Sequence, residues 1–208
     1  WDNQLSQIDD HIDLGGLLNK SKHGTDLSKY RAIIQKSDVT IELKDKLYSD
    51  LKGLSQEYGY TLNAILQYAW HKTLSIYGNS KTTVVGTTIS GRNLPIDYIE
   101  QSEGLYINTL PLIIEHDADA MISSVLNQVQ TKINELNCNS NISLAKLQIE
   151  GMSLFDCIFV YENYPTPKPV KNSLIQVSKI KSIEEFDYPI CIIAYEHYNQ
   201  IVINIKYA

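Results

Sequence analysis

The sequence has few features of a disulfide-bonded, metal-binding or membrane-spanning protein. Its three cysteines, Cys138, Cys157 and Cys191, are widely spaced and form no C-x-x-C pair. This pattern predicts neither a zinc site nor a disulfide framework, and it suits reduced thiols in a cytoplasmic protein. No apolar run approaches the roughly 20 residues that a spanning helix needs. The N-terminus also lacks the basic region and apolar core of a signal peptide.

The chain also has little positive charge. It carries 18 Lys and Arg against 24 Asp and Glu, a net charge of −6, without a basic block. This balance gives no support to nucleic acid or an anionic membrane as a partner. Phenylalanine is scarce, with three residues against fourteen tyrosines. Tyrosine suits half-wet clefts and interfaces as well as cores, although strand propensity explains the excess equally simply.

Hydrophobic periodicity predicts an α/β fold, a mixed β-sheet with packed helices. Residues 1–36 lack a regular pattern and are expected to form a connector. Helices are predicted at about 47–58, 61–78 and 117–137, the second capped by Thr61 and the third by Asp117. Pro111 implies an edge strand or a bulge. Strands are predicted at 38–43, 83–90, 105–115, 155–161, 174–180, 189–196 and 200–207.

Several short segments carry a family resemblance because they occur together and in order. They are Thr61–Gln67 with Ala69–Trp70, Val85–Arg92, Glu103–Pro111, Ser143–Gln148, Phe155–Asp156 with Val160–Pro165, and Tyr188–Pro189. The set closely resembles the second half of the condensation domains of nonribosomal peptide synthetases, and the resemblance covers about residues 27–207.

The resemblance implies the fold of the chloramphenicol-acetyltransferase-like, CoA-dependent acyltransferases, in which two lobes form a V around a tunnel. Residues 1–36 would be the crossover linker from an N-terminal lobe, and residues 37–208 the C-terminal lobe. The implied partners are that N-terminal lobe, peptidyl carrier proteins with phosphopantetheine arms, and an adjacent adenylation domain. The implied reaction forms a peptide bond between carrier-bound thioesters. No cofactor or metal is expected on this lobe itself.

The family's catalytic motif is absent from this chain. The motif is His-His-x-x-x-Asp-Gly, and its histidine positions or deprotonates the attacking amine. The five histidines of the chain are isolated and none matches. The motif belongs to the first lobe, so the chain by itself is expected to be inactive. We also expect His71 and His197 to lie at the surface and Trp70 to lie in the core.

Four residues are candidates for the tunnel or for the loop that forms its floor: Ser90, Gly91, Arg92 and Asn108. Arg92 can hold a phosphate or carboxylate, or brace the loop by donating to backbone carbonyls. Ser90 can donate to substrate or cap the turn. The Asn108 amide can orient a thioester carbonyl or tie down the edge strand.

A second group follows the strand predicted at 155–161. In the family the stretch after it approaches the first lobe as a latch, which makes Tyr161, Glu162, Asn163 and Tyr164 candidates for the lobe interface. Their polar groups can equally cap the strand end. Two other functions stay open: an epimerization or ester-forming, carrier-dependent acyltransferase lobe, or a non-catalytic module that docks carrier proteins.

Overall fold

The alternating and helical patterns form a single mixed sheet with helices packed against it. The computed structural model describes residues 1, 37–92, 94–148, 153–163 and 187–207. In chain order, the elements are β1 (Ser37–Leu43), α3 (Asp45–Tyr58), α4 (Leu62–Gly78), β2 (Thr82–Ile89), the 3-10 turn η2 (Ile99–Gln101), β3 (Asn108–Glu115), α5 (Ile122–Cys138), α6 (Leu144–Leu147), β4 (Cys157–Glu162), β5 (Ile190–His197) and β6 (Gln200–Tyr207).

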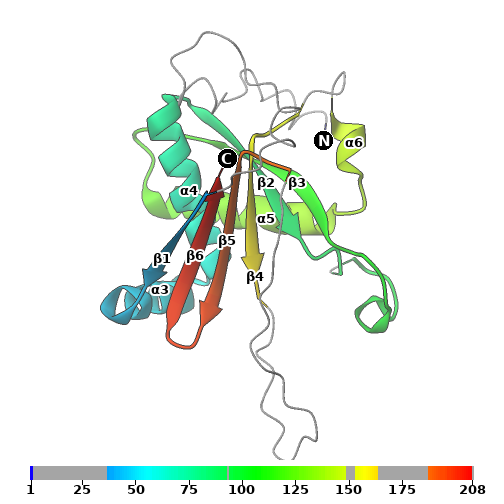
Figure 1. Cartoon of the computed structure of the whole chain (residues 1–208), viewed down its shortest axis with the longest axis horizontal. Helices are drawn as coiled ribbons and strands as arrows, with labels where there is room; N and C mark the ends of the chain where they lie inside the picture. The colour runs from blue at the N-terminus through cyan, green and yellow to red at the C-terminus, as the bar shows by residue number, and fades with distance from the viewer. Residues whose placement is uncertain (2–36, 93, 149–152, 164–186, 208) are drawn as a thin grey trace, which may run out of the picture.

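The described strands make one six-stranded sheet in the order β1-β6-β5-β4-β2-β3. Strands β2, β4 and β5 run parallel, and the other neighbours are antiparallel. Parallel neighbours need crossover connections, and α5 lies on the crossover between β3 and β4. Figure 1 shows α4 and α5 together on one face of the sheet. The mixed sheet with packed helices confirms the predicted α/β architecture.

Local sequence signals set most of the element ends. Thr61 caps α4, because its side chain accepts a hydrogen bond from the Ala64 N–H. Gly59 ends α3 with a φ of 74°, a left-handed conformation in which a side chain would be strained. Pro111 lies in β3, the edge strand beyond β2. Proline has no backbone N–H, and at this edge position the sheet loses no hydrogen bond because of it.

Three sequence expectations were wrong in detail. Helix α5 begins at Ile122 after Met121. The Asp117 side chain instead accepts from the Asp119 N–H in the preceding turn. Strand β3 begins at Asn108, because the residues before it fold back on Arg92. His71 is fully buried, since it lies on the same stripe of α4 as Gln67 and Leu74.

Other sequence predictions concern the burial of single side chains and segments that the structure does not describe. His197 is exposed, as predicted, whereas Trp70 is only partly buried and packs against the core instead of lying within it. Cys157 and Cys191 are buried thiols, and burial raises the pKa of Cys157 to about 12. Apart from Trp1, the connector at 1–36 lies outside the described residues, as do the strand at 174–180 and Tyr164.

The strand register places a polar row of β2 beneath α4. Thr83 and Thr87 point to the helix side, where Thr87 donates to the buried side-chain oxygen of Gln67 at 3.1 Å. Successive strand residues face opposite ways, so Gly86 faces away from α4. The ring of Phe155 covers Gly86 there, and a Cβ on that glycine would overlap the ring. This close approach fixes the seam between β2 and the start of β4.

Candidate functional site

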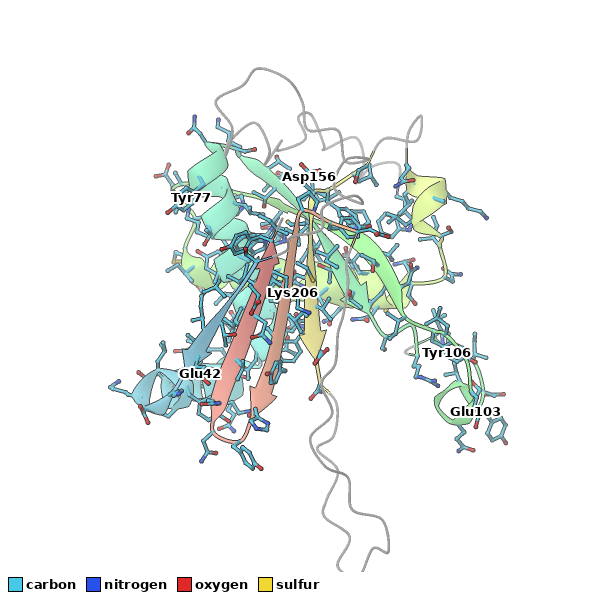
Figure 2. All side chains as sticks on the ribbon, viewed as in Figure 1. Glu42, Tyr77, Glu103, Tyr106, Asp156 and Lys206 are labelled. Carbon is cyan, nitrogen blue, oxygen red and sulfur yellow. The ribbon has the colours of Figure 1, made fainter. Side chains whose placement is uncertain are left out.

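The loop between β2 and β3 leaves the sheet and folds into a compact unit of its own. It runs from Ser90 to Ile107 and includes η2. Figure 1 shows it projecting beyond the end of the sheet, and Figure 2 marks Glu103 and Tyr106 on its two sides. The loop contains Ser90, Gly91 and Arg92, three of the four candidate residues, and Asn108 follows it directly. Since Ile89 pairs with Asn108, the structure brings all four candidates together.

Arg92 forms the centre of this loop. Its Nη1 donates to the backbone oxygens of Ile99 at 2.7 Å and Ser102 at 2.9 Å. Its guanidinium carbon lies 4.4 Å from the centre of the Tyr106 ring, a cation–π stack. These are the contacts of the bracing alternative, in which the charged guanidinium donates to backbone carbonyls.

Tyr106 closes the same unit from its other end. Its hydroxyl lies 2.6 Å from the Ser102 Oγ, which in turn donates to the Ile99 carbonyl at 2.8 Å. Gly91 has a φ of 64°, and a Cβ there would overlap the backbone oxygen of Tyr106. Only glycine therefore fits where the two ends of the loop meet.

The two flanking candidates are also tied to backbone. The Ser90 side-chain oxygen accepts from the Arg92 N–H at 3.4 Å, a weak turn contact. The Asn108 Nδ2 donates to the carbonyls of Ser140 at 3.0 Å and Ile142 at 2.6 Å. Asn108 therefore ties the start of β3 to the segment between α5 and α6. Both side chains make the contacts of the structural alternatives considered from the sequence.

Replacing Asn108 tests this tie directly. We expect Asn108→Ala to lower the free energy of unfolding by about 2 kcal/mol, because two carbonyls lose their donor. Urea unfolding followed by circular dichroism measures the change. Asn127→Ala, an exposed position on α5, is the matched control and should stay within about 0.5 kcal/mol. An equal loss in both variants would contradict the tie.

The second group of candidates lies at the end of β4. Tyr161 is half-buried against the core. Burial, reinforced by the charge of Glu196 and by Tyr48, raises the pKa of Tyr161 to about 12. Glu162 is partly buried and Asn163 is exposed. Because β2 and β4 are parallel neighbours, their carboxyl ends share one edge of the sheet. The two candidate groups therefore lie along the same edge without forming one cluster.

Sequence reasoning missed a polar cluster at this same edge. Glu196, near the end of β5, accepts from the Tyr48 hydroxyl at 2.5 Å and from the Lys52 Nζ at 3.0 Å. Burial opposes ionisation of Glu196, but the hydrogen bonds from Tyr48 and Lys52 outweigh it, and its pKa is lowered. The bond to Glu196 is the main reason that the pKa of Tyr48 rises to about 12. Tyr48 and Lys52 lie one helical turn apart on α3, which was the available sequence signal.

The described residues carry no evident metal centre. Among them, no three His, Cys, Asp or Glu side chains gather closely enough to hold an ion. No helix within the described ranges is long and apolar enough to cross a membrane. The chemistry of the loop is that of a braced backbone scaffold, since the guanidinium of Arg92 is already committed to carbonyls and to Tyr106.

Known proteins of similar sequence are large peptide synthetases. N-(5-amino-5-carboxypentanoyl)-L-cysteinyl-D-valine synthase of Amycolatopsis lactamdurans is 37% identical over 100% of this chain, which spans 6% of that protein. Bacitracin synthase 3 of Bacillus licheniformis is 32% identical over 79% of the chain and 2% of its own length. The chain thus covers only a small part of these relatives.

Solved structures share the fold at low sequence identity. The condensation domain of the Monacolin K polyketide synthase MokA superposes with a TM-score of 0.69 at 16% identity, over 91% of this chain and 44% of that one. The X-domain from teicoplanin biosynthesis gives a TM-score of 0.69 at 18% identity, over 84% and 42%. The acyltransferase-like fold predicted from the resemblance is thereby confirmed. The family model of the condensation domain matches residues 1–208, and the chain belongs to the condensation-domain family of the nonribosomal peptide synthetases.

Proposed function

We propose that this chain is the C-terminal lobe of a condensation domain, and that it forms peptide bonds only together with an N-terminal lobe. Residues 37–208 would be the lobe and residues 1–36 the crossover linker. The main support is that the chain matches 44% of the MokA condensation domain and 42% of the teicoplanin X-domain, a little under half of each. The amine of an acceptor-bound amino acid would attack the donor thioester, transferring the acyl group and releasing the donor carrier's thiol.

Within this division of work, the lobe supplies a scaffold rather than a proton acceptor. None of its histidines fits the motif that would position the amine. Ser90, Gly91, Arg92 and Asn108 would set the floor of the tunnel, with Arg92 holding the loop shape. Tyr161, Glu162, Asn163 and Tyr164 would lie where the latch leaves for the other lobe. A stably shaped floor helps catalysis by holding the reacting groups in a near-attack geometry.

The partners follow from the same proposal. Two peptidyl carrier proteins would present substrates on phosphopantetheine arms, with an adenylation domain next in the chain, and the lobe itself would bind no cofactor. The buried thiols of Cys157 and Cys191 suit a reducing cytoplasm. The whole-chain similarity to the cysteinyl-D-valine synthase makes cysteinyl and valyl thioesters the substrates to test first.

A reconstitution experiment tests the proposal. The chain alone and a complete condensation domain containing it would each be incubated with cysteinyl and valyl carrier proteins, and products followed by mass spectrometry. We expect a dipeptidyl thioester from the complete domain and none from the chain alone. Peptide formed by the chain alone would contradict the division of work. An inverted Cα configuration without a new amide would favour epimerization, an ester would favour the ester-forming alternative, and carrier binding without product would favour a docking module.

A further inference from the structure

A chain of three polar side chains lies between α4 and the far end of the β2–β3 hairpin. The His71 Nδ1 lies 2.6 Å from the Thr83 Oγ1, and the His116 Nε2 lies 2.8 Å from the same oxygen. His71 comes from α4, Thr83 from β2, and His116 follows β3. His71 and Thr83 are fully buried, and His116 is partly exposed. Three elements are thus joined through one hydroxyl group.

The surroundings of both imidazoles oppose a positive charge. Burial, together with the nearby His116 and Lys132, lowers the pKa of His71 to about 3. Burial and the charge of Lys72 lower the pKa of His116 to about 4. Lys132, on α5, also donates to the Ile113 carbonyl at 2.8 Å. Burial lowers the pKa of Lys132, and the nearby Glu115 and Glu135 oppose part of that lowering.

The number of available protons restricts how the three groups are connected. One Thr83 O–H cannot donate to two imidazole nitrogens at once, so at least one imidazole must donate an N–H to Thr83. The His71 Nε2 is buried and has no hydrogen-bond partner within the described part of the chain. A buried N–H without an acceptor is rarer than an unpaired acceptor. The proton of His71 therefore belongs on Nδ1, where it is donated to Thr83.

We propose that His71, Thr83 and His116 form an acid-sensitive joint that holds α4 against the β2–β3 hairpin only while both imidazoles are neutral. Thr83 accepts from the His71 Nδ1–H, and its own O–H donates to the His116 Nε2 or to the Ile114 carbonyl oxygen, which lies 3.5 Å away. Protonation of His116 places a positive charge in a partly buried position near Lys72. A proton on the enclosed Nε2 of His71 finds no acceptor in the described part of the chain. The joint is a property of the fold and does not depend on the proposed peptide-bond activity.

The direction of the pH effect follows from the lowered pKa values. In the unfolded chain an imidazole binds its proton near pH 6.5. The folded chain resists protonation down to about pH 4 at His116 and about pH 3 at His71. Stability from the joint is therefore complete above about pH 6.5 and is lost progressively as the pH falls toward 4. Each imidazole should raise the unfolding equilibrium constant by about 30-fold between pH 7.5 and 5.0.

Urea unfolding of this chain at pH 7.5 and 5.0 measures the effect. The His116→Gln variant should show a rise in the unfolding constant about 30-fold smaller than that of the unaltered chain. Comparing the variant with the unaltered chain removes the pH effect of the carboxylates, because both proteins contain the same ones. His197→Gln, a change at an exposed position, is the matched control and should leave the ratio unchanged. An unchanged ratio in His116→Gln would overturn the proposal.

A double-mutant cycle separates a connected joint from two independently buried imidazoles. Thr83→Val and His116→Gln together should raise the unfolding constant about tenfold less than the product of their separate effects. If the double variant's effect on the unfolding constant equals the product of the two single effects, the proposal of a connected joint is overturned. If these variants fail to fold, nitrogen-15 NMR of the unaltered chain decides the matter. His71 should stay neutral with its proton on Nδ1 to pH 5, and an imidazolium signal there at that pH would refute the proposal.

Discussion

Gly86→Ala is expected to lower the free energy of unfolding by about 3 kcal/mol. The added methyl carbon would lie 2.6 Å from the Phe155 Cζ and closer still to its Cε2. The ring has little freedom to withdraw, because it is 2% exposed and stacks on Tyr188 at 5.3 Å. Gly86 also lies in a strand paired on both sides, opposite Pro111 and Ile158. Backbone movement there would disturb both ladders. Thermal and urea unfolding measure the loss.

A second glycine provides the control for this prediction. Gly53 lies on the exposed side of α3, and a Cβ there meets nothing within 4 Å. Gly53→Ala should raise the free energy of unfolding by about 0.5–1 kcal/mol, because alanine favours the helix. Shrinking the ring by Phe155→Leu should offset part of the Gly86→Ala loss. Additive losses in the double variant would show that the ring is not the obstacle.

Arg92→Lys is expected to lower kcat/KM of the complete condensation domain by about 100-fold. A lysine keeps the charge but lacks the planar guanidinium that reaches two carbonyls through its Nη1 while stacking on Tyr106. The loop would then lose its shape, and the reacting groups their alignment. Peptide formation would be measured with loaded carrier proteins. Chymotrypsin cleavage after Tyr98 or Leu105 would report loop opening in the isolated chain as well.

Two variants of the same loop calibrate the Arg92 result. Tyr106→Phe keeps the stacked ring and loses only the contact with Ser102, so it should cost less than Arg92→Lys. Tyr98→Phe removes a hydroxyl from a side chain that is 78% exposed and should change neither activity nor cleavage. Full activity of the Arg92→Lys variant would refute the proposal that the contacts of Arg92 shape the tunnel floor for catalysis. Faster cleavage would still verify its bracing of the loop.

The site could be located from the sequence more easily than it could be described. Arg92, between a buried strand and a Gly- and Pro-containing loop, was recognisable as an unusual charge, and both of its possible roles were foreseeable. The choice between them depended on Ile99, Ser102 and Tyr106. These residues are seven to fourteen positions away, and the loop returns to Arg92 through no regular element but the short η2 turn. No short-range rule predicts such a return.

The sequence alone indicated the longer helices, most strands, their order and the family, because hydrophobic period, helix caps and ordered motifs are local properties of the chain. Thr61, Gly59 and Pro111 each act through their nearest neighbours or their own backbone. Only the tertiary structure decided which polar groups are enclosed. His71 resembles a surface histidine until β2 brings Thr83 within 2.6 Å of it. Gly86 resembles an ordinary strand glycine in the sequence, and only the fold shows that the Phe155 ring packs directly against it on the sheet face opposite α4. Burial and pairing depend on segments distant in sequence, and those contacts exist only once the sheet has formed.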